Sequence, residues 1–206
     1  VRINYRLGPF GWFTHPAIQD FQSGIDKTSN FGTLDIIAAL NWVQENISSF
    51  GGNPKNVTIF GESAGGHNVY SLLVSEKANK LFHKAIAMSG YTTSISTIDA
   101  YKPKKKSSTS NFSSNNIVNK ILKDQSQSRN PSEYTSEEVR NILLELSAED
   151  FFNYYSDRKA YEELPLLTAD GIAIPKMGLR KALAEEKFIN KVMCLFSKSN
   201  LTSSYF

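Results

Sequence analysis

The sequence predicts an α/β fold in which helices flank a central and mostly parallel sheet. Three short runs typical of strands, at 1–5, 57–60 and 84–89, alternate with segments of helical periodicity. Strands joined through helices run parallel, because the crossover returns the chain to the same end of the sheet. A tight glycine-rich turn at 61–66 joins the second run directly to a helix.

The first half of the chain sets out these elements in order. We expect a strand at 1–5, a turn at Gly8-Pro9 and a polar loop to about residue 30. Between 31 and 49 the apolar side chains recur at steps of four, three and four, which predicts one amphipathic helix. The next elements are a buried strand at 57–60, a helix after the turn at 61–66, and a buried strand at 84–89.

The composition changes after residue 90. Residues 91–116 are rich in Ser, Thr and Asn and predict a mobile loop. Helices are expected at 115–124 and 136–146, and a capping box from Thr135 to Glu138 opens the second. We expect a hairpin-like return at 170–175, a short helix at 177–185 and a strand at 192–196.

Length and charge narrow the class of protein. The 206 residues suffice for one sizeable core, so we expect one partial domain over 1–206. The net charge of +3 is too small to indicate a nucleic-acid partner. No apolar run reaches the roughly 18 residues of a membrane span. The first residues lack a signal-peptide layout and read as a truncated N-terminus, which leaves the compartment open.

The turn at 61–65 carries the chemistry. Gly61-Glu62-Ser63-Ala64-Gly65 fits the pattern G-x-S-x-G, with a strand before it and a helix after it. A serine on such a sharp turn is lifted above the end of the sheet, and glycines two residues away avoid a collision. The helix that follows directs its first N–H groups toward an oxyanion. We interpret Ser63 as a nucleophile.

Several segments carry a resemblance to a known family, the type-B carboxylesterases and cholinesterases. They are NYRLG at 4–8, NFGTLD at 30–35, ALNWVQENI at 39–47, FGGNP at 50–54, VTIFGESAGG at 57–66 and LFHKAIAMSG at 81–90. The resemblance implies an α/β-hydrolase fold, here incomplete at both ends. It also implies hydrolysis of a small carboxylic ester through an acyl-serine, without metal or organic cofactor.

The same resemblance assigns roles to four residues. Ser63 corresponds to the nucleophile, and the Ala64 N–H to an oxyanion donor. Glu62 corresponds to a fixed negative charge beside the pocket, although a surface carboxylate is an equal alternative. Ser89 corresponds to a serine that supports the acid–histidine pair, unless it only ends a strand.

The rest of a catalytic triad is missing from the sequence. A serine needs a base, and the base needs an orienting acid. His67 and His83 read as packing residues, and His15 lies in a loop that the sequence does not place. The position of the family's acid holds Thr202, and no Asp or Glu follows residue 192. We interpret this tail as a frameshift or aberrant end near Lys191, an interpretation that a strand-paired tail would oppose.

Two alternatives to an active esterase stay open. The chain could be a non-catalytic interaction module on the same scaffold, although such a module has no need of a strained serine. It could also be an inactive truncated product. A parallel sheet without its flanking strands has unpaired edges, so we expect reliance on a complementing fragment.

Overall fold

The computed structural model describes residues 1–102, 113–155, 167–185 and 193–197. The chain divides into two compact units, which are described separately. The sheet unit comprises Val1–Tyr5, Thr33–Ser94 and Ala173–Phe206, and the helical unit comprises Arg6–Gly32 and Ile95–Ile172. Each unit has buried apolar clusters of its own.

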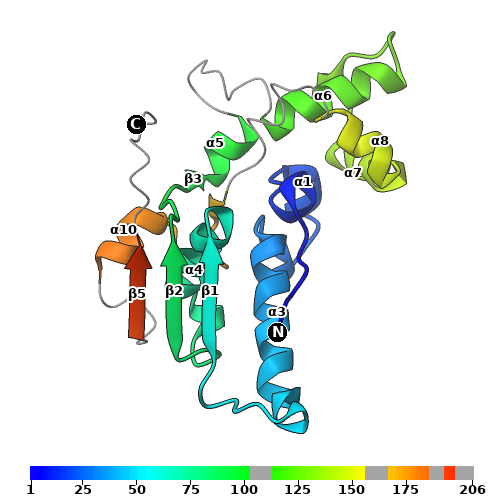
Figure 1. Ribbon diagram of the computed structural model, residues 1–206. Coiled ribbons are helices and arrows are strands. Elements are labelled where there is room, and N and C mark those ends of the chain that lie inside the picture. Colours follow the sequence, from blue (N-terminus) through cyan, green and yellow to red (C-terminus); the bar gives the residue numbers. More distant parts are fainter. Residues whose placement is uncertain (103–112, 156–166, 186–192, 198–206) are drawn as a thin grey trace. The chain divides into compact units, whose positions relative to one another are not determined.

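A parallel three-stranded sheet organises the sheet unit (Figure 1). The strand order is β1-β2-β5, and Glu62 of β1 lies opposite Met88 of β2. The strands and helices predicted around 57–89 are confirmed. The elements are the strands β1 (Thr58–Glu62), β2 (Lys84–Met88) and β5 (Met193–Ser197), the helices α3 (Phe31–Asn46), α4 (Ala64–Val74) and α10 (Leu179–Ala184), and the 3-10 turns η2 (Ile47–Phe50) and η3 (Glu76–Ala78).

The core of this unit lies between the sheet and α4. Leu72 and Leu73 of α4 are fully buried, as are Ala85 and Ala87 on alternate positions of β2. Alternation follows from the strand's two-residue period, and the small alanine side chains let the helix approach the sheet closely. This packing holds the N-terminal end of α4 close to the C-terminal end of β1.

Of the strands expected at the two ends of the sheet unit, the one at 1–5 is wrong and the one at 192–196 is confirmed. Residues 1–5 have a strand-like composition, but they form no strand and belong to neither of the described sheets. The strand expected at 192–196 is confirmed as β5, which pairs with β2 in parallel register from Met193 to Ser197. That pairing counts against a frameshift near Lys191. Thr202 lies outside the described residues.

The helical unit contains more regular structure than the sequence predicted. The expected loop to residue 30 contains three short helical turns, because Pro9 and Pro16 each occupy the first turn of a helix. Part of the loop expected at 91–116 is a short strand and a helix. The elements are α1 (Gly8–Gly11), α2 (Pro16–Gln19), η1 (Gly24–Lys27), β3 (Ile95–Ser96), α5 (Thr97–Tyr101), α6 (Ser114–Gln125), η5 (Pro131–Glu133), α7 (Ser136–Glu145), α8 (Ala148–Asn153) and β4 (Thr168–Ala169).

Residues 168–175 do not form the hairpin-like return that we expected. β4 pairs in parallel with β3, and residues 171–174 form bends. Asn30 joins β4 to the first segment of the unit: its side chain donates to the Thr168 carbonyl and accepts from the Thr168 N–H, each at 2.9 Å. A long-range side-chain clamp of this kind leaves no local sequence pattern.

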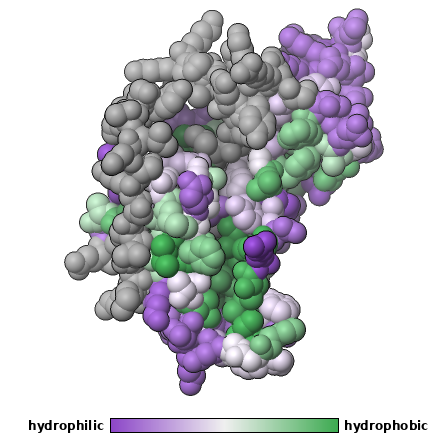
Figure 2. Space-filling view, viewed as in Figure 1, coloured by the Kyte–Doolittle hydropathy of each residue, from purple (hydrophilic) through white to green (hydrophobic). Residues whose placement is uncertain are grey.

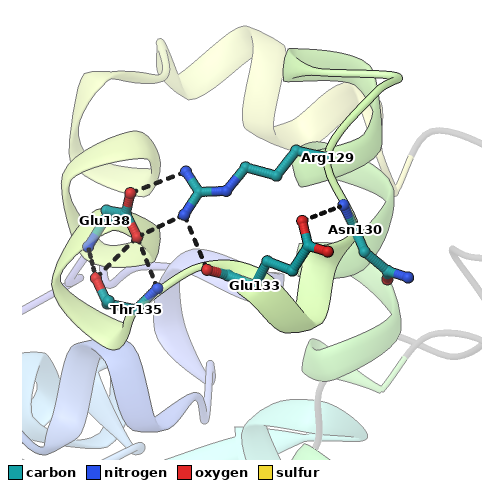
Figure 3. A network of polar contacts seen from close by, with 5 residues as sticks. All are labelled: Arg129, Asn130, Glu133, Thr135 and Glu138. Carbon is teal, nitrogen blue, oxygen red and sulfur yellow. Dashed lines mark hydrogen bonds and ion pairs between the residues drawn. The ribbon is translucent and has the colours of Figure 1, made fainter.

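The two longer helices of this unit, α6 and α7, match the predicted helices. The capping box from Thr135 to Glu138 is confirmed. Glu138 also accepts two hydrogen bonds from the Arg129 guanidinium, at 2.8 and 3.0 Å (Figure 3). The Arg129 side chain, together with the Thr135 N–H and hydroxyl, lowers the pKa of Glu138 to about 2. The Glu138 carboxylate is therefore ionised at neutral pH, and its hydrogen bonds hold the start of α7.

Within the described residues, no helix combines the length and apolar character that a bilayer crossing requires.

We expect Phe82→Ala to lower the free energy of unfolding by about 3–5 kcal/mol, because it empties a core position. Phe82 is 3% exposed, whereas Phe50 in the same unit is 72% exposed and provides a matched control. Phe50→Ala is expected to cost less than about 1 kcal/mol. Urea unfolding of both variants measures the difference, and equal losses would contradict the described core.

Candidate active site

Ser63 lies on a strained turn between β1 and α4. Its backbone angles are φ 53 and ψ −114, a region that residues other than glycine rarely occupy. The Ser63 N–H donates to the Met88 carbonyl at 2.9 Å, and the Ser63 carbonyl accepts from the His67 N–H at 3.0 Å. Strain of this kind costs about 1–3 kcal/mol and persists only where surrounding contacts hold it. The turn leaves the Ser63 residue exposed.

The first glycine of the motif is required by a backbone contact. A Cβ on Gly61 would lie 2.4 Å from the backbone carbon and oxygen of Gly65, closer than any real contact. The Gly65 position is different, because a Cβ there meets no atom within 4 Å. The expectation that both glycines must lack a side chain is therefore confirmed for Gly61 and wrong for Gly65.

A second glycine contact packs the first turn of α4 against the end of β2. A Cβ on Gly66 would lie 2.8 Å from the Met88 carbonyl oxygen, and a Cβ on Gly90 would lie 2.6 Å from the Gly66 backbone. Our interpretation of the sequence did not identify this contact. Its signal is a glycine close behind each strand end, at Gly66 after β1 and at Gly90 after β2.

Ala64 is the first residue of α4, and the first N–H groups of a helix have no acceptor within the helix. The eleven residues of α4 place the positive end of the helix dipole at this turn. The Ala64 residue is exposed beside Ser63. This is the geometry expected of an oxyanion donor.

Glu62 and Ser89 lie at the same edge of the sheet. Because Glu62 pairs in register with Met88, Ser63 and Ser89 each follow the last paired residue of adjacent parallel strands. Ser89 also has a positive φ of 51, so both strands end in a sharp turn at a serine. Glu62 is exposed at the end of β1. The structure thus brings all four predicted site residues to one edge of the sheet.

His67 is a packing residue, as the sequence indicated. Its Nε2 lies 2.8 Å from the Thr93 carbonyl oxygen, and its ring lies 4.1 Å from the Tyr91 ring. Burial lowers the pKa of His67 to about 4, so the ring is neutral at pH 7 and its Nε2–H donates to Thr93. The ring is thus held by the Thr93 backbone, and no hydrogen bond joins it to the side chain of Ser63 among the described contacts.

The other two histidines are also held by backbone groups. The Nδ1 of His83 accepts from the Val57 N–H at 3.2 Å, which ties the loop before β2 to the start of β1. In the helical unit, the Nδ1 of His15 accepts from the Ala17 N–H at 3.2 Å and caps α2. This places His15, which the sequence left unassigned. Among the described residues, no group of His, Cys, Asp and Glu is arranged to hold a metal ion.

We expect Gly61→Ala to destabilise the protein by about 1–3 kcal/mol, because its Cβ overlaps the Gly65 backbone. Gly65→Ala is the matched control: its Cβ enters open space on a helix, where alanine is favoured over glycine by up to about 1 kcal/mol. Urea unfolding of both variants gives the comparison. A loss of the same size in the two variants would contradict the described turn.

The pKa of His67 predicts a pH dependence of stability. The folded pKa of about 4 lies below the usual 6.5, so the unfolded chain binds more protons between these values. Stability is therefore full above pH 6.5 and falls as the pH drops toward 4, by up to about 3 kcal/mol from this residue. His67→Gln keeps a donor toward Thr93 without titrating, and should flatten the fall in urea-unfolding experiments. An unchanged slope would show that His67 is not buried as described.

Comparison with known proteins shows which family the chain resembles. The sequence model of the family described as "Carboxylesterase family" matches residues 1–205. Carboxylesterase 1E of Rattus norvegicus is 36% identical over 195 residues, which cover 91% of this chain and 31% of the rat protein. Para-nitrobenzyl esterase of Bacillus subtilis (strain 168) is 52% identical over 90 residues, 44% of this chain and 17% of the bacterial protein.

Solved structures agree with the sequence matches. A structure titled PNB esterase superposes with a TM-score of 0.71 at 30% identity, covering 96% of this chain and 36% of the other. The chain therefore spans about a third of the length of the relatives that match most of it, with 31% of the rat enzyme and 36% of the PNB esterase. On this combined basis the chain has an α/β-hydrolase fold and belongs to the carboxylesterase family.

Proposed function

We propose that this chain contributes the nucleophile to the hydrolysis of carboxylic esters, through an acyl-serine intermediate at Ser63. The observation that carries the proposal is the strained backbone of Ser63, at φ 53, on the N-terminal end of α4. Membership of the carboxylesterase family supports ester hydrolysis in general. The substrate class that we propose is a small to medium ester with an apolar acyl group.

The proposed reaction has two steps. The Ser63 oxygen attacks the ester carbonyl carbon and loses its proton to a base, and the carbonyl oxygen becomes an oxyanion near the Ala64 N–H. The alcohol leaves with a proton, and water then attacks the acyl-serine to release the carboxylic acid and restore Ser63. Glu62 would contribute a fixed negative charge beside the pocket, and Ser89 would support the acid–histidine pair.

The proposal requires a base, and none of the three histidines forms a hydrogen bond with the Ser63 side chain among the described contacts. His67 and His83 are engaged by backbone groups of the sheet unit, and His15 caps a helix in the other unit. Because the chain spans 31% of the length of the rat relative, we propose that the base and its acid come from a complementing polypeptide segment.

The open edge of β1 supports this part of the proposal. Among the described residues, β1 pairs only with β2, and a cavity of about 790 Å³ lies along its other side. Val1, Ile3 and Tyr5 line the cavity together with Ile59 and Phe60 of β1 and apolar residues of α3. Figure 2 shows the hydrophobic surface gathered between β1 and α3. An added strand would satisfy the free backbone groups of β1 and cover this apolar surface.

The position of the cavity links strand addition to catalysis. It extends to Gly65 in the first turn of α4, next to the proposed oxyanion donor Ala64. A strand that fills it would end beside Ser63, where its backbone N–H groups could add to that donor. The same segment would thus complete both the sheet and the oxyanion site.

A fluorophosphonate ester tests the nucleophile, because it forms a stable bond only with an activated serine. We expect the chain alone to react slowly, since its serine lacks a base, and Ser63→Ala to abolish the reaction. Ser49→Ala removes an exposed serine elsewhere in the sheet unit and is the control. Mass spectrometry of the labelled peptide gives the readout, and equal labelling of the wild-type chain and Ser63→Ala would refute the proposal.

A second arm tests complementation. The chain is co-expressed with the segments of the Bacillus subtilis para-nitrobenzyl esterase that lie outside the match, and labelling is measured again. We expect faster labelling that still depends on Ser63. Rapid labelling of the chain alone would instead show that one of its own histidines acts as the base.

The rival function, a binding scaffold without catalysis, is less well supported. A binding surface gains nothing from a strained serine, and the cost of about 1–3 kcal/mol would be selected against. The exposed Ser63 and the exposed Ala64 at the helix start favour the reacting site instead.

A further inference from the structure

A cavity of about 460 Å³ in the helical unit has no role in the proposed ester chemistry. It lies among α2, α5, α6, and the segment from η5 to the start of α7. All of its lining residues belong to this one unit. What the cavity binds can therefore be argued from the contacts of the helical unit alone.

The floor of the cavity is apolar. Ala17, Val118, Leu122 and Val139 line it and are at most 6% exposed. They belong to the buried cluster around Phe13, so the floor is part of the core rather than a surface depression. Such a floor favours a ligand with a short apolar body.

One wall of the cavity is polar and basic. Asn115, Asn119 and Lys123 recur every four residues of α6 and therefore share one face of that helix. Lys102 lines the cavity from the end of α5. The structure gives neither lysine a carboxylate partner among the described residues, and the described lining contains no Asp or Glu. Within the described lining the wall thus carries two positive charges and no negative one, while Asp20, outside the lining, acts electrostatically on the ring of His15.

His15 adds a buried donor to this wall. The residue is 7% exposed, and its ring lies between Phe13 at 6.3 Å and the edge of Tyr101 at 5.1 Å. Its Nδ1 accepts the Ala17 N–H, so the neutral ring carries its hydrogen on Nε2. No hydrogen bond joins that Nε2–H to another described residue. With the Nδ1 edge turned to the α2 backbone, the Nε2 edge is the part of the ring left for the cavity.

We propose that this cavity binds a small carboxylate that carries a short apolar tail. The carboxylate would lie between Lys102 and Lys123 and accept the Nε2–H of His15. The tail would cover Val118 and Leu122. The half-buried Asn119 amide is positioned on the same wall to donate a further hydrogen bond. The carboxylate would thus contact the polar wall and the tail would contact the apolar floor, and this binding would not involve Ser63.

The test is an NMR titration of the full chain with hexanoate, with 1-hexanol and inorganic phosphate as matched probes. We expect hexanoate to shift the His15 side-chain nitrogen signals and to bind about tenfold more tightly than hexanol, because only hexanoate can accept charge-assisted hydrogen bonds. Phosphate should bind more weakly than hexanoate, because it leaves the apolar floor uncovered. Equal affinities for hexanoate and hexanol, or for hexanoate and phosphate, would overturn the proposal.

Three variants locate the site. His15→Asn keeps a capping acceptor for α2 but removes the Nε2–H, so hexanoate should bind more weakly while the backbone amide spectrum stays folded. Lys123→Gln should weaken binding about threefold, whereas Lys120→Gln removes the same charge from α6 outside the cavity and should leave it unchanged. If Lys120→Gln matches Lys123→Gln, or if His15→Asn binds normally, the anion is not held where we propose.

Discussion

The close approach of three backbone segments at the ends of β1 and β2 is the constraint on which the site depends. Gly61 touches Gly65, and Gly66 touches Gly90, so no side chain fits between the strand ends and the first turn of α4. The Ser63 N–H bond to the Met88 carbonyl closes this arrangement. Close packing around the turn fixes its backbone conformation. The packing thereby holds Ser63 in backbone angles that a serine would otherwise avoid.

The same arrangement depends on the parallel order of the strands. Parallel strands end at one edge, so the turns after β1 and β2 bring Ser63 and Ser89 to neighbouring positions. The small side chains of Ala85 and Ala87 on the buried face of β2 let α4 lie close enough for the glycine contacts to form. The chemistry of the edge thus rests on core packing several residues away from it.

All three histidines are held by backbone groups, but they differ in what surrounds the ring. Each uses a ring nitrogen on a backbone group: His67 on the Thr93 carbonyl, His83 on the Val57 N–H and His15 on the Ala17 N–H. Burial lowers the pKa of both His67 and His15 to about 4, which suits neutral hydrogen-bonding roles rather than proton transfer near pH 7. His15 differs from the other two in lining the cavity of the helical unit, and that difference suggested a ligand site there.

Local patterns in the sequence determined the helices α3, α4, α6 and α7, the strands β1, β2 and β5, and the turn that carries Ser63. Periodicity, capping residues and glycine spacing act over a few residues, so they can be read without knowledge of the fold. Other features depended on contacts between distant segments. Residues 1–5 have strand composition but belong to neither described sheet, and the Asn30 clamp on Thr168 joins positions far apart in the chain. The burial of His15 against Phe13 and against Tyr101 of α5 is decided only by the tertiary structure, because a side chain's contacts depend on what packs around it.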